Sequence, residues 1–178
     1  MDMRVVLVPG KLELKNPILS ASGTFGYGTE YSPYGDITGL GGIITNGITL
    51  EPCAGAPMPR IVETPSGVLR AVGTQNGGAR HFADEILPGI PWNQVPVIPN
   101  LNATNVDDFA AISDILSAER GVAAMEINLS CPNDHRNGQP FCQNPVTAAR
   151  AVNSVRRSAR GKPIIAKLSP RTIDIVEV

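Results

Sequence analysis

A cluster of side chains suited to chemistry, Glu126-Ile-Asn-Leu-Ser-Cys-Pro-Asn133, follows a short apolar run. The thiol of Cys131 can act as a nucleophile or general base once its surroundings favour loss of the proton. A single cysteine is often a buried structural residue. Core strands, however, seldom carry as many side chains that need partners as Asn128, Ser130 and Asn133. We therefore interpret this segment as part of a functional site.

The residues before this cluster predict the element that positions it. Residues 122–127 are mostly apolar and a loop signal follows them, so we expect a short buried strand there. Similar runs lie at 17–20, 41–45, 95–98 and 163–168, and helical patterns lie between them at 77–87, 105–116 and 145–156. This alternation predicts an α/β fold with a parallel sheet and right-handed crossovers. A β-hairpin of 4–8 and 11–15, turning at Pro9-Gly10, is expected ahead of it.

Helix ends and one long connection are also visible in the sequence. Thr104 or Asn105 is expected to cap the second helix, and Asn144 followed by Pro145 gives the third an N-cap and a first-turn proline. The connection 50–76 is too long to be a passive loop in a compact domain. Residues 60–63 and 68–72 predict a hairpin within it, and such insertions usually shape a pocket.

Each predicted strand is followed by polar or glycine-rich residues. Because the carboxyl ends of parallel strands meet at one face, these residues would converge into a cradle for a polar planar ligand with a phosphate. Any single one of them can equally be a loop residue that bonds its own backbone. The segments are 20–23, 45–47, 100–102, Asn128 and Lys167.

The composition argues against several classes of protein. The chain has 178 residues, 42% of them hydrophobic, and a formal net charge of -1, so it lacks the basic footprint of a nucleic-acid-binding protein. No apolar run approaches the length of a membrane span, and the N-terminus does not resemble a signal peptide. Three cysteines in no metal-binding pattern predict a reducing, cytoplasmic location and no metal site.

Several motifs along nearly the whole chain resemble those of the dihydroorotate dehydrogenases of class 1, most closely the N-terminal part of the NAD-linked class 1B catalytic subunit. Their order along the chain makes the resemblance specific. The motifs are Asn16-Pro-Ile-Leu-Ser-Ala-Ser-Gly-Thr-Phe-Gly26, Glu51-Pro52, Pro59-Arg-Ile-Val-Glu-Thr64, Gly73-Thr-Gln-Asn76, Asn128-Leu-Ser-Cys-Pro-Asn133 and Ala166-Lys-Leu-Ser-Pro170.

The resemblance implies a TIM barrel that holds FMN at its C-terminal face and oxidises dihydroorotate to orotate in pyrimidine biosynthesis. A base removes the C5 proton of the substrate while C6 delivers a hydride to the flavin. Cys131 stands at the position of that base. The resemblance also implies an electron-transfer subunit carrying an iron-sulfur centre and FAD.

The same resemblance assigns roles to other residues. Ser22, Asn46, Gly47, Asn100, Asn128 and Lys167 match flavin-contacting positions. Substrate-contacting positions match Asn46, Arg70, Ala71, Val72, Gly73, Thr74, Asn128 and Asn133. An alternative for Lys167 is a purely structural ion pair with Glu126.

The chain departs from the family pattern at three places. Asn46 stands where the family usually has a lysine, and the stretch Arg70-Ala-Val-Gly-Thr74 replaces an Asn-x-x-Gly-Leu pattern. If Arg70 points inward, it restores charge lost at Asn46, because arginine binds carboxylates as a bidentate fork. Asn102 places a polar side chain at a normally small position.

Length is a further departure, because a complete barrel typically needs about 250 residues. We therefore expect residues 1–178 to be a single incomplete flavin-binding TIM-barrel domain with about five of the eight strands. Its open sheet edges favour pairing with a second copy as a homodimer. Two alternatives stay open: a related flavin oxidoreductase acting on another dihydropyrimidine, and a truncated remnant without catalytic activity.

Overall fold

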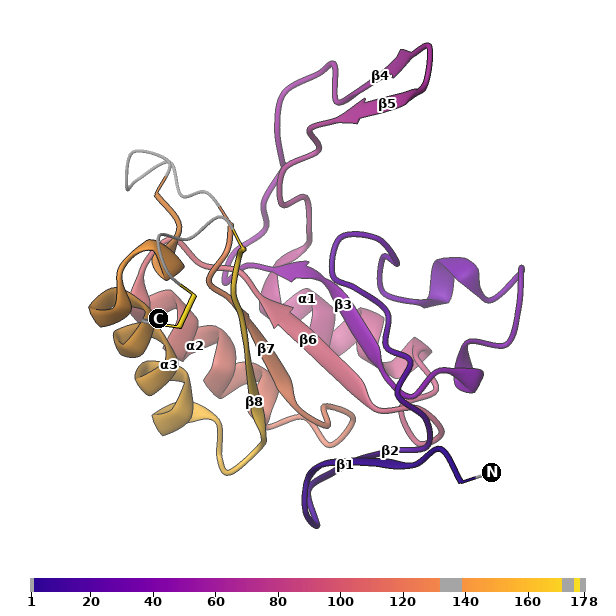
Figure 1. Cartoon of the computed structure of the whole chain (residues 1–178), viewed down its shortest axis with the longest axis vertical. Helices are drawn as coiled ribbons and strands as arrows, with labels where there is room; N and C mark the ends of the chain where they lie inside the picture. The colour runs from indigo at the N-terminus through magenta and orange to yellow at the C-terminus, as the bar shows by residue number, and fades with distance from the viewer. Residues whose placement is uncertain (1, 132–138, 171–174, 177–178) are drawn as a thin grey trace.

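A parallel sheet forms the centre of the computed structural model, which describes residues 2–131, 139–170 and 175–176. Its four strands lie in the order β3 (Ile43–Ile48), β6 (Val97–Leu101), β7 (Met125–Asn128) and β8 (Ile164–Lys167) (Figure 1). All neighbouring pairs are parallel, as predicted from the alternation of strands and helices. The α/β class is therefore confirmed, while closure into a barrel stays a prediction.

The prediction of a strand at 17–20, the first of the five, is wrong. This segment forms only an isolated parallel bridge between Leu19 and Gly42. The hydroxyl of Ser20 accepts a hydrogen bond from the backbone N–H of Ile44 at 2.9 Å and lies 3.0 Å from the carbonyl oxygen of Ile44, to which it donates. A side chain thus takes the place of the next backbone pair, and the ladder ends there.

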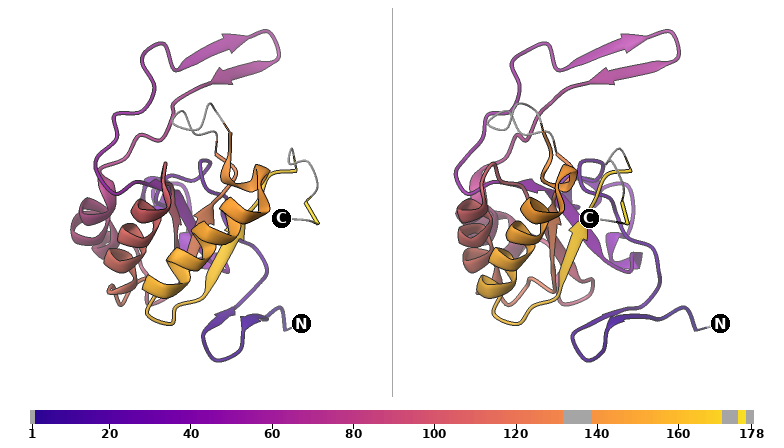
Figure 2. Two further views of the ribbon diagram at one scale, coloured as in Figure 1. Left: turned by 90° about the vertical axis from the view of Figure 1, so that its left-hand side faces the viewer. Right: turned by 60° about the vertical axis from the view of Figure 1, so that its left-hand side comes forward.

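Helices cover one face of the sheet (Figure 2). They are α1 (Gly78–His81), which continues into a π-helical turn at Phe82–Ile86, α2 (Val106–Ser117) and α3 (Pro145–Ser158). The side chains of Asn105 and Asn144 cap α2 and α3 by accepting backbone N–H groups, as predicted. Short 3-10 turns lie at Thr29–Tyr31, Ile37–Gly39, Leu87–Gly89 and Phe141–Gln143. In the described part of the chain, no helix is long and apolar enough to cross a bilayer.

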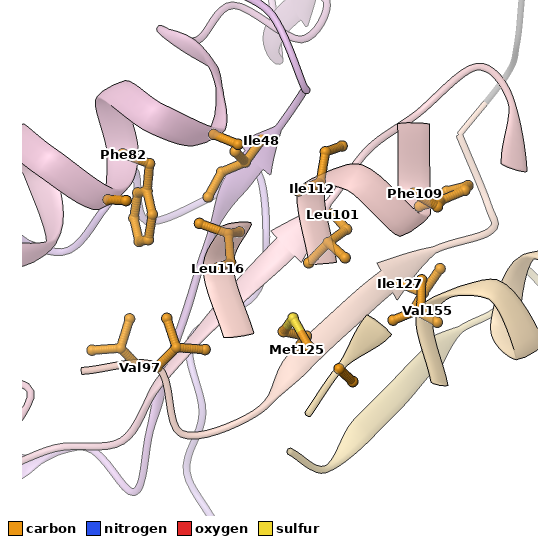
Figure 3. Packing of buried hydrophobic residues seen from close by; sticks show 14 of the residues in the cluster. Ile48, Phe82, Val97, Leu101, Phe109, Ile112, Leu116, Met125, Ile127 and Val155 are labelled. Carbon is orange, nitrogen blue, oxygen red and sulfur yellow. The ribbon is translucent and has the colours of Figure 1, made fainter. Parts of the chain in front are cut away.

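The main core lies between the sheet and these helices (Figure 3). Alternate strand residues such as Leu101, Met125 and Ile127 pack against Phe109 and Leu116 of α2. A second apolar layer lies on the opposite face, beneath the predicted hairpin of β1 (Val5–Val8) and β2 (Leu12–Leu14). Its buried members are Leu12, Leu14, Ile44, Ile98 and Ala124.

The predicted hairpin in the long connection is confirmed. Strands β4 (Ile61–Thr64) and β5 (Gly67–Arg70) are antiparallel and project from the body of the molecule (Figure 1). All eight residues are exposed. The guanidinium of Arg60 fixes the base of the hairpin by donating to the carbonyl oxygen of Ala56 and to the side chain of Gln75.

Candidate functional site

A polar layer occupies the helix-free face of the sheet, toward the carboxyl ends of the strands. Asn100 lies two residues beyond Ile98, and Glu126 two residues beyond Ala124, so both share the face of the second apolar layer. The strand register aligns Gly47, Asn100 and Glu126. One step further, Asn128 is aligned with Lys167. Residues predicted from separate strand ends therefore do converge at one edge.

The centre of this layer is a buried hydrogen bond between two side chains. The Nδ2 of Asn100 donates to Oε1 of Glu126 at 2.5 Å, and both residues are buried. Since a carboxylate only accepts, the bond fixes the amide of Asn100 with its oxygen turned away. Within the described residues, that Oδ1 atom is buried without a hydrogen-bond partner. A buried acceptor of this kind suits an N–H group of a bound ligand.

Gly47 lies beside this acceptor. A Cβ atom at Gly47 would lie 3.2 Å from Cγ2 of Thr74 and 3.5 Å from Oδ1 of Asn100. A side chain at residue 47 would therefore press on the methyl group of Thr74 and contact the unpartnered oxygen. Glycine at this position lets the backbone of β3 lie close to Thr74 and Asn100.

The Cys131 thiol borders a pocket of about 900 Å³. Thr74 and Asn102 line the same pocket, and Nδ2 of Asn102 donates to Oγ1 of Thr74 at 2.8 Å. The same Nδ2 lies 4.0 Å from Sγ of Cys131. The hairpin base at Thr74, the end of β6 at Asn102 and the loop after β7 at Cys131 thus meet at this pocket, although they are far apart in the sequence. The site lies where the base of the projecting hairpin returns to the sheet.

The family model for dihydroorotate dehydrogenase matches residues 6–178. The chain belongs to the dihydroorotate dehydrogenase family. It is 49% identical over 173 residues to the catalytic subunit of dihydroorotate dehydrogenase B (NAD(+)) from Solidesulfovibrio magneticus, covering 97% of this chain and 56% of that protein. The corresponding subunit from Desulforudis audaxviator is 45% identical over 175 residues, covering 98% of this chain and 57% of that protein. The chain thus spans about half the length of these relatives, and the predicted family is confirmed.

The residues that the family resemblance assigns to flavin contacts lie in different surroundings. Asn46 is half-buried, and its Nδ2 lies 3.5 Å from the carbonyl oxygen of Gln75. Ser22 is half-buried in the loop before β3. Lys167 is half-buried at the end of β8, and it forms no salt bridge with Glu126 within the described residues. The structural ion pair considered for Lys167 is therefore absent, and Glu126 pairs with Asn100 instead.

The stretch from Arg70 to Thr74, implied for the substrate, is split by the fold. Gly73 and Thr74 line the pocket, whereas Arg70 and Ala71 are exposed at the hairpin and do not line it. The carbonyl oxygen of Val72 accepts from the backbone of Ala56, which closes the base of the hairpin. Arg70 is thus not among the residues that surround the thiol.

The loop after β7 contains a local network. Oδ1 of Asn128 accepts from Oγ of Ser130 at 2.7 Å and from the backbone N–H of Ser130 at 3.2 Å. The hydroxyl of Ser130 thus donates to Asn128. Asn133 lies outside the described residues.

The residue that sequence reasoning undervalued is Asn102. The sequence marks it as part of the polar segment 100–102 and as a polar side chain at a normally small position, and it connects the thiol loop to the hairpin base. Its place in the polar segment 100–102, which follows the strand predicted at 95–98, was the available signal. The partner, Thr74, lies 28 residues away in sequence, and no local pattern links the two.

Proposed function

We propose that the protein oxidises dihydroorotate to orotate in pyrimidine biosynthesis with FMN as cofactor, and that residues 1–178 form an incomplete TIM-barrel domain carrying the base. The observation that carries this proposal is the buried, unpartnered Oδ1 of Asn100 beside Gly47, next to the thiol pocket. A buried acceptor without a partner on the polar strand edge suits the N–H of a flat heterocycle. The thiol of Cys131, which borders the neighbouring pocket, supplies the acid–base group.

The residues that would hold FMN are those of the polar layer and its rim: Ser22, Asn46, Gly47, Asn100, Asn128 and Lys167. Their fit rests on Asn100 and Gly47, as described above. Bound FMN supplies the acceptor for the hydride that leaves C6 of the substrate. The ammonium of Lys167 on this face favours negative charge that develops on a bound ring.

The base in this proposal is the Cys131 thiolate, which takes the proton from C5 of dihydroorotate. Loss of that proton and of the C6 hydride leaves the C5–C6 double bond of orotate. Substrate contacts are assigned to Asn46, Gly73, Thr74, Asn128 and Asn133, whereas Arg70 and Ala71 lie outside the pocket. Among the assigned residues, Gly73 and Thr74 have the strongest support because they line the thiol pocket.

Two variants test this function. Cys131→Ser should lower the rate of orotate formation by about 100-fold or more, because a hydroxyl is a far weaker acid than a thiol and a positioned base contributes about that much. Cys53→Ser is the matched control, since Cys53 lines the same pocket on another segment. Equal rates in the Cys131→Ser variant and the parent protein would remove Cys131 from the mechanism.

A second candidate is oxidation of another dihydropyrimidine. It is favoured by the amide of Asn102 and the hydroxyl of Thr74, which place polar groups against the thiol. Asn46 also leaves that position without a cation. Comparison of dihydroorotate with the uncharged 5,6-dihydrouracil under the same assay separates the two, and turnover of dihydrouracil alone would replace the first proposal.

We also propose protein partners, from the names of the relatives and from exposed apolar side chains. The relatives are named as catalytic subunits, which supports an electron-transfer partner, here an iron-sulfur and FAD subunit that uses NAD. Apolar side chains on the β4–β5 hairpin, Ile61, Val62, Val68 and Leu69, are exposed and suit a protein contact such as a homodimer. The three free thiols support a cytoplasmic location.

A further inference from the structure

Asn102 is held rigidly at the end of β6. Its backbone N–H donates to the carbonyl oxygen of Ile48 at 2.9 Å, which ties it to the neighbouring strand. Its side-chain Nδ2 donates to Oγ1 of Thr74 at 2.8 Å. An amide nitrogen carries two hydrogens, and Sγ of Cys131 lies 4.0 Å from the same nitrogen. One hydrogen is thus engaged by Thr74, and the other is available to the sulfur.

We propose that Asn102 is a positioning residue that directs an amide N–H at the Cys131 sulfur and favours its thiolate form. A donor to the charged form of a group stabilises that form. The 4.0 Å contact is long for the neutral thiol, but hydrogen bonds at catalytic sites shorten when the charged species forms. The inference rests on the proposed function for its purpose, while its test requires neither flavin nor substrate.

Thr74 holds the amide nitrogen of Asn102 near the sulfur. Without an anchor, the side chain of Asn102 could turn over and present its oxygen, which would repel a thiolate. The hydrogen bond from Nδ2 to Oγ1 of Thr74 holds the nitrogen on the side of Cys131. Thr74 therefore acts through Asn102.

Other ionisable groups around the pocket oppose thiolate formation. Glu51 and Asp108 line it with carboxyl side chains, and Cys53 lines it with a second thiol. Like charges disfavour ionisation of a nearby thiol. Among the described lining residues there is no Lys or Arg, so the amide of Asn102 supplies a compensating donor.

The experiment measures the alkylation rate of each cysteine by iodoacetamide between pH 6 and 10, with peptide mass spectrometry to resolve the three thiols. Asn102→Ala should raise the pKa of Cys131 by about half a unit, and the isosteric Asn102→Asp by about one unit or more, because it places a carboxylate at the sulfur. Thr74→Val should shift it in the same direction as Asn102→Ala. Cys53 should keep its profile throughout.

The buried Cys142 reports on folding, because it reacts only if the chain opens. An unshifted Cys131 profile in a folded Asn102→Ala variant would overturn the inference, and an unshifted profile in Thr74→Val would overturn the anchoring role. If Asn102→Ala does not fold, Thr74→Val decides alone. A shifted Cys131 with no dihydroorotate oxidation would uphold this inference and remove the proposed function. Oxidation of dihydroorotate that depends on Cys131, with unshifted alkylation profiles in the variants, would uphold the proposed function and overturn this inference.

Discussion

Removal of the Asn100 side chain should destabilise the fold strongly, because it strips a buried carboxylate of its donor. Hydrogen bonds to charged groups contribute about 1.5 to 3 kcal/mol, and a charged group left unsatisfied costs more. The bond from Nδ2 to Glu126 is 2.5 Å and lies wholly in the interior. We therefore expect Asn100→Ala to lower the free energy of unfolding by about 2 to 3 kcal/mol.

Replacement of the acceptor, Glu126, is expected to destabilise the fold less than removal of the Asn100 side chain. In Glu126→Gln the amide oxygen still accepts from Asn100 and no charge is buried, so the loss should stay below about 1 kcal/mol. In the double variant Asn100→Ala with Glu126→Gln, the loss should be smaller than the sum of the two single losses, because the carboxylate stranded by Asn100→Ala is gone. Asn153→Ala, on the exposed side of α3, is the matched control.

Urea unfolding followed by the fluorescence of the single tryptophan, Trp92, measures all four variants. The expected order of stability places Glu126→Gln well above Asn100→Ala. Equal losses for the two single variants, with simple additivity in the double variant, would refute the assignment of a fixed Asn100 orientation. The unpartnered oxygen would then lose its significance for ligand binding.

Three further changes test the elements around the site. Asn144→Ala should cost about 1 kcal/mol in urea unfolding by removing the cap of α3, and a loss under a few tenths would contradict the capping role. Gly73→Ala should weaken substrate binding, measured as a higher KM. Residue 73 has φ +71, and a Cβ there would lie 2.7 Å from the backbone nitrogen of Ala56. An unchanged KM would show that the hairpin base adjusts freely. Hydrogen bonds from Thr38 lower the pKa of Asp36, so its stabilising effect is present above the unfolded pKa of about 3.9 and is lost as the pH falls through the lower folded value. The stability difference between the parent protein and Asp36→Ala should therefore shrink on acidification, and a difference that grows would contradict this.

The regular elements could be predicted because their signals are local. Asn105 and Asn144 precede apolar periodic stretches and cap helices as expected. The hairpin of Ile61–Thr64 and Gly67–Arg70 forms where residues 60–63 and 68–72 predict one. The failure at 17–20 has a tertiary cause. The hydroxyl of Ser20 bonds the backbone of Ile44, and no propensity encodes that contact.

The site was predictable as a location but not as a set of contacts. The strand ends identified Asn100, Asn128 and Lys167, since the fold class alone brings carboxyl ends together. The pair of Glu126 with Asn100 depends on the strand register, which single-sequence patterns do not specify across a crossover. The contact of Asn102 with Thr74 depends in addition on how the projecting hairpin returns to the sheet.

The most direct test of the central claim is the rate of flavin bleaching when the purified protein is mixed anaerobically with dihydroorotate, compared with substrate deuterated at C5. Proton removal by the Cys131 thiolate predicts a primary isotope effect and bleaching at least about 100-fold slower in Cys131→Ser. Bleaching at an unchanged rate in Cys131→Ser, or no bleaching in the parent protein with FMN bound, would contradict the account.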